Sequence, residues 1–159
     1  MSVQARRVVT GHDGNGRAVV KIDEISKNVV SNRPGASACV IWTTDTSPAD
    51  NSGEFDGAAG KVGTTLAGGT VFRVVEFSPG VAPRVHRTDS IDYAVVLSGE
   101  IDMELEKGDE VHLKAGDLLV QRGTVHCWVN RGKAPCVIAF VLVDAKPATA
   151  GGKVLSAFG

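Results

Sequence analysis

The sequence lacks the features that mark membrane, secreted and nucleic-acid-binding proteins. Its apolar runs fall short of the 18 or more residues that a membrane span needs, and its first residues lack the apolar segment of a secretory signal. The formal charge of -1 comes without the basic face that a phosphate backbone attracts. We therefore expect a cytoplasmic protein that has neither a membrane nor a nucleic-acid partner.

Cysteines and helix-forming runs are also scarce. The three cysteines, Cys39, Cys127 and Cys136, show no CxxC spacing, and pairing would leave one over, so we expect reduced, buried thiols. With few helix-forming runs and 19 glycines, the chain favours an all-β fold. At 159 residues it is most simply one domain with a core of its own.

Short runs of β-forming residues follow one another through the second half of the chain. Glycine turns separate many of them, and their near-regular spacing predicts an antiparallel sandwich or barrel. The expected strands cover residues 71–77, 85–97, 101–106, 110–113, 117–121, 126–129 and 136–143.

The flanking segments are simpler. Residues 3–25 are expected to form a hairpin around a turn rich in Gly, Asp and Asn, residues 26–37 a connector, and residues 37–44 a strand. Residues 44–69 form a long loop that either covers the mouth of a pocket or makes a surface excursion. The Ala/Pro/Gly-rich tail, 144–159, is expected to pack on the outside or fray.

Two histidines stand among polar residues at strand spacing. In an extended strand, residues two apart share a face, which places His86, Thr88 and Asp92 together. By the same rule, His126 and Trp128 share a face. If the two segments are neighbours, His86, Asp92 and His126 converge.

These residues carry a resemblance to the cupin superfamily. Two motifs within residues 79–130 are similar to the two cupin motifs, and their positions are Gly80, His86, Asp92 and Gly99 for the first, then Gly116, Gln121, Gly123, His126 and Asn130 for the second. The resemblance implies a double-stranded β-helix, or jelly-roll, antiparallel barrel. It also implies one cupin domain over residues 1–159, with a hairpin extension at 1–30. The flanks resemble small cupins of polyketide and aromatic-compound pathways, some of them decarboxylases or dehydratases.

The sequence departs from the cupin pattern at the metal ligands. Thr88 stands where the second histidine is usual, and Asp92 replaces a glutamate. The resemblance leaves His86, Asp92 and His126 as a facial set that suits Fe and can hold Mn, Ni or Zn. The alternative is a site without metal, in which these residues orient a ligand.

Substrate binding is expected from residues near this set. An arginine offers a planar fork to a carboxylate, and Arg73, Arg84, Arg87 and Arg122 are the candidates. Arg73 is favoured, whereas Arg87 is expected to point away from the His86 face. Thr88, Gln121 and Trp128 complete the predicted substrate-binding set, with Trp128 either packing in the core or walling an apolar pocket.

Three functions are compatible with these residues. The first is a metal-dependent lyase, a decarboxylase or dehydratase, with His86, Asp92 and His126 as catalytic groups. The second is a non-haem iron dioxygenase with the same ligands, and the third a metal-free binding module, which the loss of histidine at Thr88 favours. The expected partner is a small molecule. A homodimer is also expected, because single-domain cupins are commonly dimers and the hairpin can add to a partner's sheet edge.

Overall fold

The computed structural model describes residues 3–159, and its regular secondary structure is almost wholly β-strand. Met1 and Ser2, which the predicted domain and hairpin extension include, lie outside the described residues. One short 3-10 turn, Glu106–Gly108, interrupts the strands. The strands are β1 (Arg6–His12), β2 (Ala18–Ile25), β3 (Val29–Arg33), β4 (Ala36–Thr44), β5 (Thr70–Phe77), β6 (Ser90–Ser98), β7 (Glu100–Glu104), β8 (Glu110–Lys114), β9 (Leu118–Arg122), β10 (Cys127–Val129), β11 (Cys136–Asp144), β12 (Ala148–Ala150) and β13 (Lys153–Leu155).

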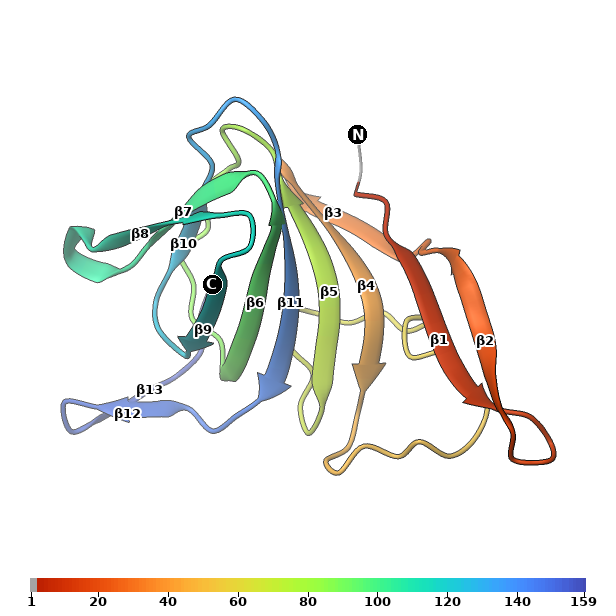
Figure 1. Cartoon of the computed structure of the whole chain (residues 1–159). Coiled ribbons are helices and arrows are strands. Elements are labelled where there is room, and N and C mark those ends of the chain that lie inside the picture. The colour runs from red at the N-terminus through yellow and green to blue at the C-terminus, as the bar shows by residue number, and fades with distance from the viewer. Residues whose placement is uncertain (1–2) are drawn as a thin grey trace.

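Two antiparallel sheets contribute side chains to a shared core. One has six strands in the order β3-β4-β5-β11-β6-β9, and the other has three in the order β10-β7-β8. In Figure 1 the larger sheet curves across the middle of the molecule, with β7, β8 and β10 beside it. The main hydrophobic cluster draws on both sheets, for example Ile138 and Phe140 of β11 with Ile101 of β7 and Trp128 of β10. The all-β, antiparallel prediction is confirmed.

Alternation along β6 decides which side chains reach the interior. Ser90, Asp92 and Ala94 are buried, whereas the intervening Tyr93 and Val95 are exposed. Successive side chains of a strand point to opposite faces, so the polar side chains of Ser90 and Asp92 lie on the same buried face of β6 as Ala94 of the apolar core. This alternation places Asp92 inside the fold rather than on its surface.

The turn after β6 requires the glycine that ends the first motif. Gly99 has a positive φ of 75°, and a Cβ there would lie 2.5 Å from the carbonyl oxygen of Pro135. Only glycine combines that backbone conformation with such a close approach. The turn carries the chain from β6 in the large sheet to β7 in the small one.

Two predicted boundaries are wrong. The strand expected from residue 85 begins at Ser90, because the preceding segment makes only isolated bridges, His86 with His126 and Arg87 with Phe158. The connector expected at 26–37 contains β3, an edge strand paired with β4. Because β3 ends in polar residues and is followed by a Pro-Gly turn, its sequence does not show the alternation of apolar and polar residues by which a strand is recognised. The tail contains the small hairpin β12–β13.

The N-terminal hairpin forms a sheet of its own. β1 and β2 form the predicted antiparallel hairpin, whose register shifts once, after Val9. The two strands lie apart from the main sheet in Figure 1. The homodimer that this hairpin suggested stays a prediction. Within residues 3–159, no helix is long and apolar enough to cross a membrane.

The loop between β4 and β5 is attached to this hairpin by an ion pair. Arg7 of β1, whose side chain is 5% exposed, donates to Asp56 of the loop and to Glu24 of β2. The ring of Phe55 also lies 5.4 Å from that of Trp42 on β4. Further along, residues 62–64 line the central cavity. Of the two interpretations of this loop, the structure favours a cover over the pocket.

Replacing Arg7 with methionine is expected to lower the free energy of unfolding by about 2 kcal/mol, because two partly buried carboxylates lose their cation. The measurement is urea denaturation followed by circular dichroism. Arg6→Met is the matched control on the same strand and should lose much less, since the side chains of the Arg6–Asp23 pair are 66% and 47% exposed and solvent screens their attraction. Equal losses in the two variants would contradict the anchoring role of Arg7.

Candidate active site

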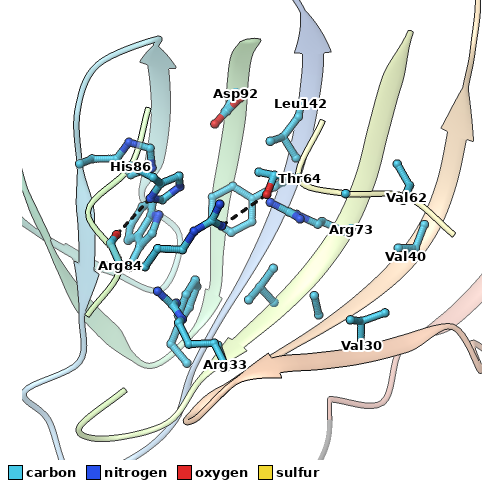
Figure 2. A pocket seen from close by; sticks show the side chains of 18 residues that line it. Val30, Arg33, Val40, Val62, Thr64, Arg73, Arg84, His86, Asp92 and Leu142 are labelled. Carbon is cyan, nitrogen blue, oxygen red and sulfur yellow. Dashed lines mark hydrogen bonds between the residues drawn. The ribbon is translucent and has the colours of Figure 1, made fainter. Parts of the chain in front are cut away.

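A cavity of about 400 Å³ opens among β4, β5, β6, β10 and β11, within the range of small-molecule sites. Its walls are mostly apolar. Trp128 contacts Phe140 edge-on at 5.6 Å and stacks near Phe77 at 5.9 Å, which gives the cavity an aromatic wall. Figure 2 shows the polar side chains that enter this space.

Two histidines lie together at one side of the cavity. The backbones of His86 and His126 hydrogen-bond to each other in both directions, and their ring centroids are 4.2 Å apart. Nδ1 of His86 lies 3.1 Å from the carbonyl oxygen of Arg84. Nδ1 of His126 lies 3.0 Å from the carbonyl oxygen of Thr124 and 2.9 Å from the amide nitrogen of Gln121. Protein groups therefore engage Nδ1 in both rings, which leaves Nε2 for a ligand.

Burial keeps both rings neutral near pH 7. It lowers the pKa of His86 to about 4, and the neighbouring His126 acts in the same direction. Burial also lowers the pKa of His126. A neutral imidazole can accept a proton, so each ring is a possible general base.

Asp92 lies buried on β6 and shares the cavity with the histidines. The hydroxyl of Ser90 donates to Oδ1 of Asp92 at 2.5 Å and lies 2.9 Å from the hydroxyl of Thr88. Burial raises the pKa of Asp92, although Ser90, His126 and Arg73 act against that rise. A carboxyl group that holds its proton to higher pH is suited to general acid catalysis.

The donor set does not fit a metal ion. No group of three or more His, Cys, Asp and Glu side chains within residues 3–159 is placed to hold one. Of the predicted ligands His86, Asp92 and His126, the two histidine rings are adjacent, and Asp92 lines the same cavity with its Oδ1 hydrogen-bonded to Ser90. Thr88, which replaces the second motif histidine, has its hydroxyl oxygen 2.9 Å from the same Ser90 hydroxyl. The cavity is also lined by arginines, whose charge opposes a cation.

Arg73 extends from β5 into the cavity. Within the described residues it makes no ion pair or side-chain hydrogen bond, and its Nε is buried without a partner. Burial lowers the pKa of Arg73 to about 10, against the opposing effect of Asp92. A half-buried guanidinium that makes no hydrogen bond within the described residues, and whose Nε is buried, indicates a place for an anionic ligand.

The structure separates the predicted substrate-binding residues into two groups. Arg73 and Trp128 line the cavity, whereas Thr88 and Gln121 do not. Thr88 is turned to Ser90, and the amide of Gln121 donates to the carbonyl of Thr124 beside His126, so both position other residues.

Among the other arginines considered, Arg84 lines the cavity, as the sequence allowed. Arg87 instead lies 5.7 Å from the ring of Phe158, and Arg122 is exposed. Sequence reasoning missed Ser90 and Arg33. Ser90 has the same strand spacing as Asp92, a usable signal, whereas Arg33 required the recognition of β3.

Comparisons with known proteins agree with this fold. Residues 73–143 match the family model described as Cupin domain. The chain is 38% identical over 159 residues to phomopsin biosynthesis cluster protein C' of Diaporthe leptostromiformis, across 94% of this chain and 83% of that one. It is 32% identical to the cupin-domain-containing oxidoreductase fogC of Aspergillus ruber, across 96% and 78%. A Klebsiella pneumoniae protein with a double-stranded beta-helix domain superposes with a TM-score of 0.52 and 21% identity, across 75% and 85%.

Proposed function

The chain belongs to the cupin-domain family, and from that premise we propose that it is a lyase that dehydrates a small hydroxy acid. One observation carries the proposal: a neutral histidine pair, a buried carboxyl group and an unpaired arginine line one apolar cavity. The similarity to a biosynthesis cluster protein supports a substrate from such a pathway. The proposed reaction uses no metal, because within residues 3–159 no group of three donor side chains is placed to hold one.

Substrate binding begins at Arg73. Its guanidinium donates to the substrate carboxylate, and this charge-assisted pair gives the half-buried Arg73 side chain the partner that its Nε lacks. The aromatic wall around Trp128 packs against the apolar part of the substrate and excludes water. The carbon next to the carboxylate then lies within the space shared by His86 and Asp92.

The elimination needs one base and one acid. Nε2 of His86 accepts the proton from the carbon next to the carboxylate, and Arg73 stabilises the negative charge that moves onto the carboxylate oxygens. The electron pair forms the carbon–carbon double bond as the C–O bond to the β-hydroxyl breaks. Asp92 donates its proton to the departing hydroxyl, which leaves as water. Proton transfer from His86 back to Asp92 restores both groups.

Dehydration fits this site better than decarboxylation. Arg73 binds the carboxylate in its charged form, and this stabilises the ground state of any reaction that expels the carboxylate as CO₂. In a dehydration, the same contact becomes stronger as charge accumulates on those oxygens. The arginine therefore favours the reaction that keeps the carboxylate.

An oxidoreductase is the second candidate function. The name of the Aspergillus ruber relative supports it, and the two adjacent histidines with free Nε2 atoms are the part of a metal site that this chain retains. A metal-free binding module, the third function considered, would use the same cavity without turnover.

The test is turnover of 3-hydroxy acids such as 3-hydroxy-3-phenylpropanoate, followed by the ultraviolet absorbance of the unsaturated product. We expect activity that EDTA leaves unchanged and that consumes no oxygen. Because a protonated His86 cannot act as a base, kcat/KM should fall as the pH falls from neutrality towards the His86 pKa of about 4. Because Asp92 must hold its proton to act as the acid, the rate should also fall as the pH rises through the raised pKa of Asp92.

Other outcomes would overturn the dehydratase proposal. Activity that requires added Fe(II) and oxygen would favour the oxidoreductase instead. Saturable binding of hydroxy acids without turnover, across the panel and the pH range, would favour the binding module.

A further inference from the structure

The cavity contains two further guanidinium groups besides Arg73. Arg33, on the edge strand β3, is half-buried, and its Cζ lies 5.9 Å from the centroid of the Phe77 ring. Arg84 donates to the carbonyl oxygen of Gly159 at 2.7 Å and to the hydroxyl of Thr64 at 3.4 Å. Within the described residues, neither makes an ion pair with an aspartate or glutamate. Figure 2 shows both side chains entering the cavity.

These charges lie close enough to repel one another. Burial lowers the pKa of Arg33, and the charge of Arg84 lowers it further. The charge of Arg84 also lowers the pKa of Arg73. Like charges in a poorly solvated space destabilise each other. Asp92 is the one carboxylate among the lining residues, and it lies beside Arg73.

Arg7 shows how the same chain treats a buried arginine that has a structural role. Its guanidinium is satisfied by two carboxylates, Asp56 and Glu24, each within 2.7 Å. Arg33 lines the cavity without a hydrogen-bond partner among the described residues, and Arg84 bonds there to a backbone oxygen and a hydroxyl but to no aspartate or glutamate. The contrast indicates that their partner is a ligand rather than another part of the fold.

We propose that Arg33 and Arg84 form a second anion subsite, and that the substrate is an organic diacid with an apolar body between its two acidic groups. One acidic group binds Arg73 beside Asp92, and the other binds Arg33 and Arg84. The assignment of the reacting end rests on the proposed dehydration, whereas the second subsite rests on the arginines alone.

The strand β5 sets the separation of the two subsites. Arg73 and Phe77 lie on the same face of β5, four residues apart, which corresponds to roughly 13 Å along an extended strand. Arg33 lies over Phe77, so the two ends of the cavity carry separate positive groups. Val75, between Arg73 and Phe77 on that face, and Phe140 on the neighbouring β11 line the space between them. A rigid ligand with acidic groups at opposite ends matches this arrangement.

Isothermal titration calorimetry with three probe ligands tests the subsite. Terephthalate has two opposed carboxylates, benzoate has one, and phenyl phosphate concentrates its charge in one group. We expect terephthalate to bind at least about tenfold more tightly than benzoate, as one further charge-assisted contact requires. Phenyl phosphate should bind no more tightly than benzoate.

Variants assign that preference to the arginines. Arg33→Met and Arg84→Met should each reduce the preference for terephthalate to less than about threefold and leave benzoate affinity unchanged, because roughly one contact is lost. Arg73→Met should weaken both ligands. Arg122→Met, at an exposed position on β9, is the matched control and should change neither affinity. Circular dichroism and thermal unfolding check that each variant is folded. If Arg84→Met disturbs the segment around His86, Arg33→Met still tests the proposal.

The outcomes separate this proposal from the dehydratase. Equal affinities for terephthalate and benzoate, or a preference that survives both arginine variants, would overturn the second subsite. Phenyl phosphate bound as tightly as terephthalate would also overturn it, since that result places the positive charge at a single point. A terephthalate preference without turnover of any hydroxy acid would refute the dehydration and leave the subsite standing.

Discussion

Replacement of Asp92 with asparagine should lower kcat for hydroxy-acid dehydration by about 10²–10⁴-fold, the usual contribution of a general acid. Asparagine keeps the shape of the side chain and can still accept the hydrogen bond from Ser90. It has no proton to give to a departing hydroxyl group. KM should stay within a few-fold of its original value, because Arg73 and the aromatic wall carry the binding.

Ser90→Ala is the matched control for this position. The Ser90 hydroxyl lowers the pKa of Asp92 by bonding to its ionised form, so its removal should raise that pKa. The enzyme would remain active, and its alkaline decline in kcat should shift to higher pH. Steady-state kinetics between pH 5 and pH 9 measure both variants. An unchanged kcat in Asp92→Asn would remove Asp92 from the chemistry and leave it a structural group.

Local patterns predicted the part of the site that one strand determines. The alternation of side chains along β6 places Asp92 inside the fold. His126 and Trp128 are also two residues apart, at the start of β10 and within it, and their rings lie close together as that spacing predicts. Glycine turns located most strand ends in the second half. The pairing of His86 with His126 also followed from the motif positions, although the structure joins them by an isolated bridge rather than by two full strands.

The parts that failed depend on contacts between distant segments. Arg33 enters the cavity because β3 pairs at the edge of the large sheet, and its polar sequence gives no alternation that would reveal a strand. The metal set of His86, Asp92 and His126 stays a prediction: spacing placed Asp92 on the correct face, but within residues 3–159 no three donor groups are placed to hold an ion.

Gln121 shows that a motif position can be structural without touching a ligand. Its side-chain amide lies against Nδ1 of His126 and donates to the carbonyl oxygen of Thr124. The side chain is buried on β9, outside the cavity. Sequence position marked the residue as part of the site, and only the fold shows that it acts through His126.

Arg73→Met is expected to have opposite effects on catalysis and on stability. The variant loses the charge-assisted contacts to the substrate carboxylate, so kcat/KM should fall by about 10²–10³-fold. In the absence of ligand, however, the wild-type protein holds a cation whose pKa burial has lowered to about 10. Removing that unpaired charge should raise the free energy of unfolding by about 1–2 kcal/mol at pH 7.

The pH dependence of this gain follows from the direction of the pKa shift. The folded protein releases the Arg73 proton more readily than the unfolded chain, so the destabilisation is fully present below pH 10 and declines as the pH rises through that value. Urea denaturation at pH 7 and pH 9 should therefore show the same gain for Arg73→Met. Arg122→Met, which removes an exposed charge, should show almost none. If Arg73→Met were less stable than the wild type, the guanidinium would have a stabilising partner within the fold, and its role as the anchor of a substrate carboxylate would fail.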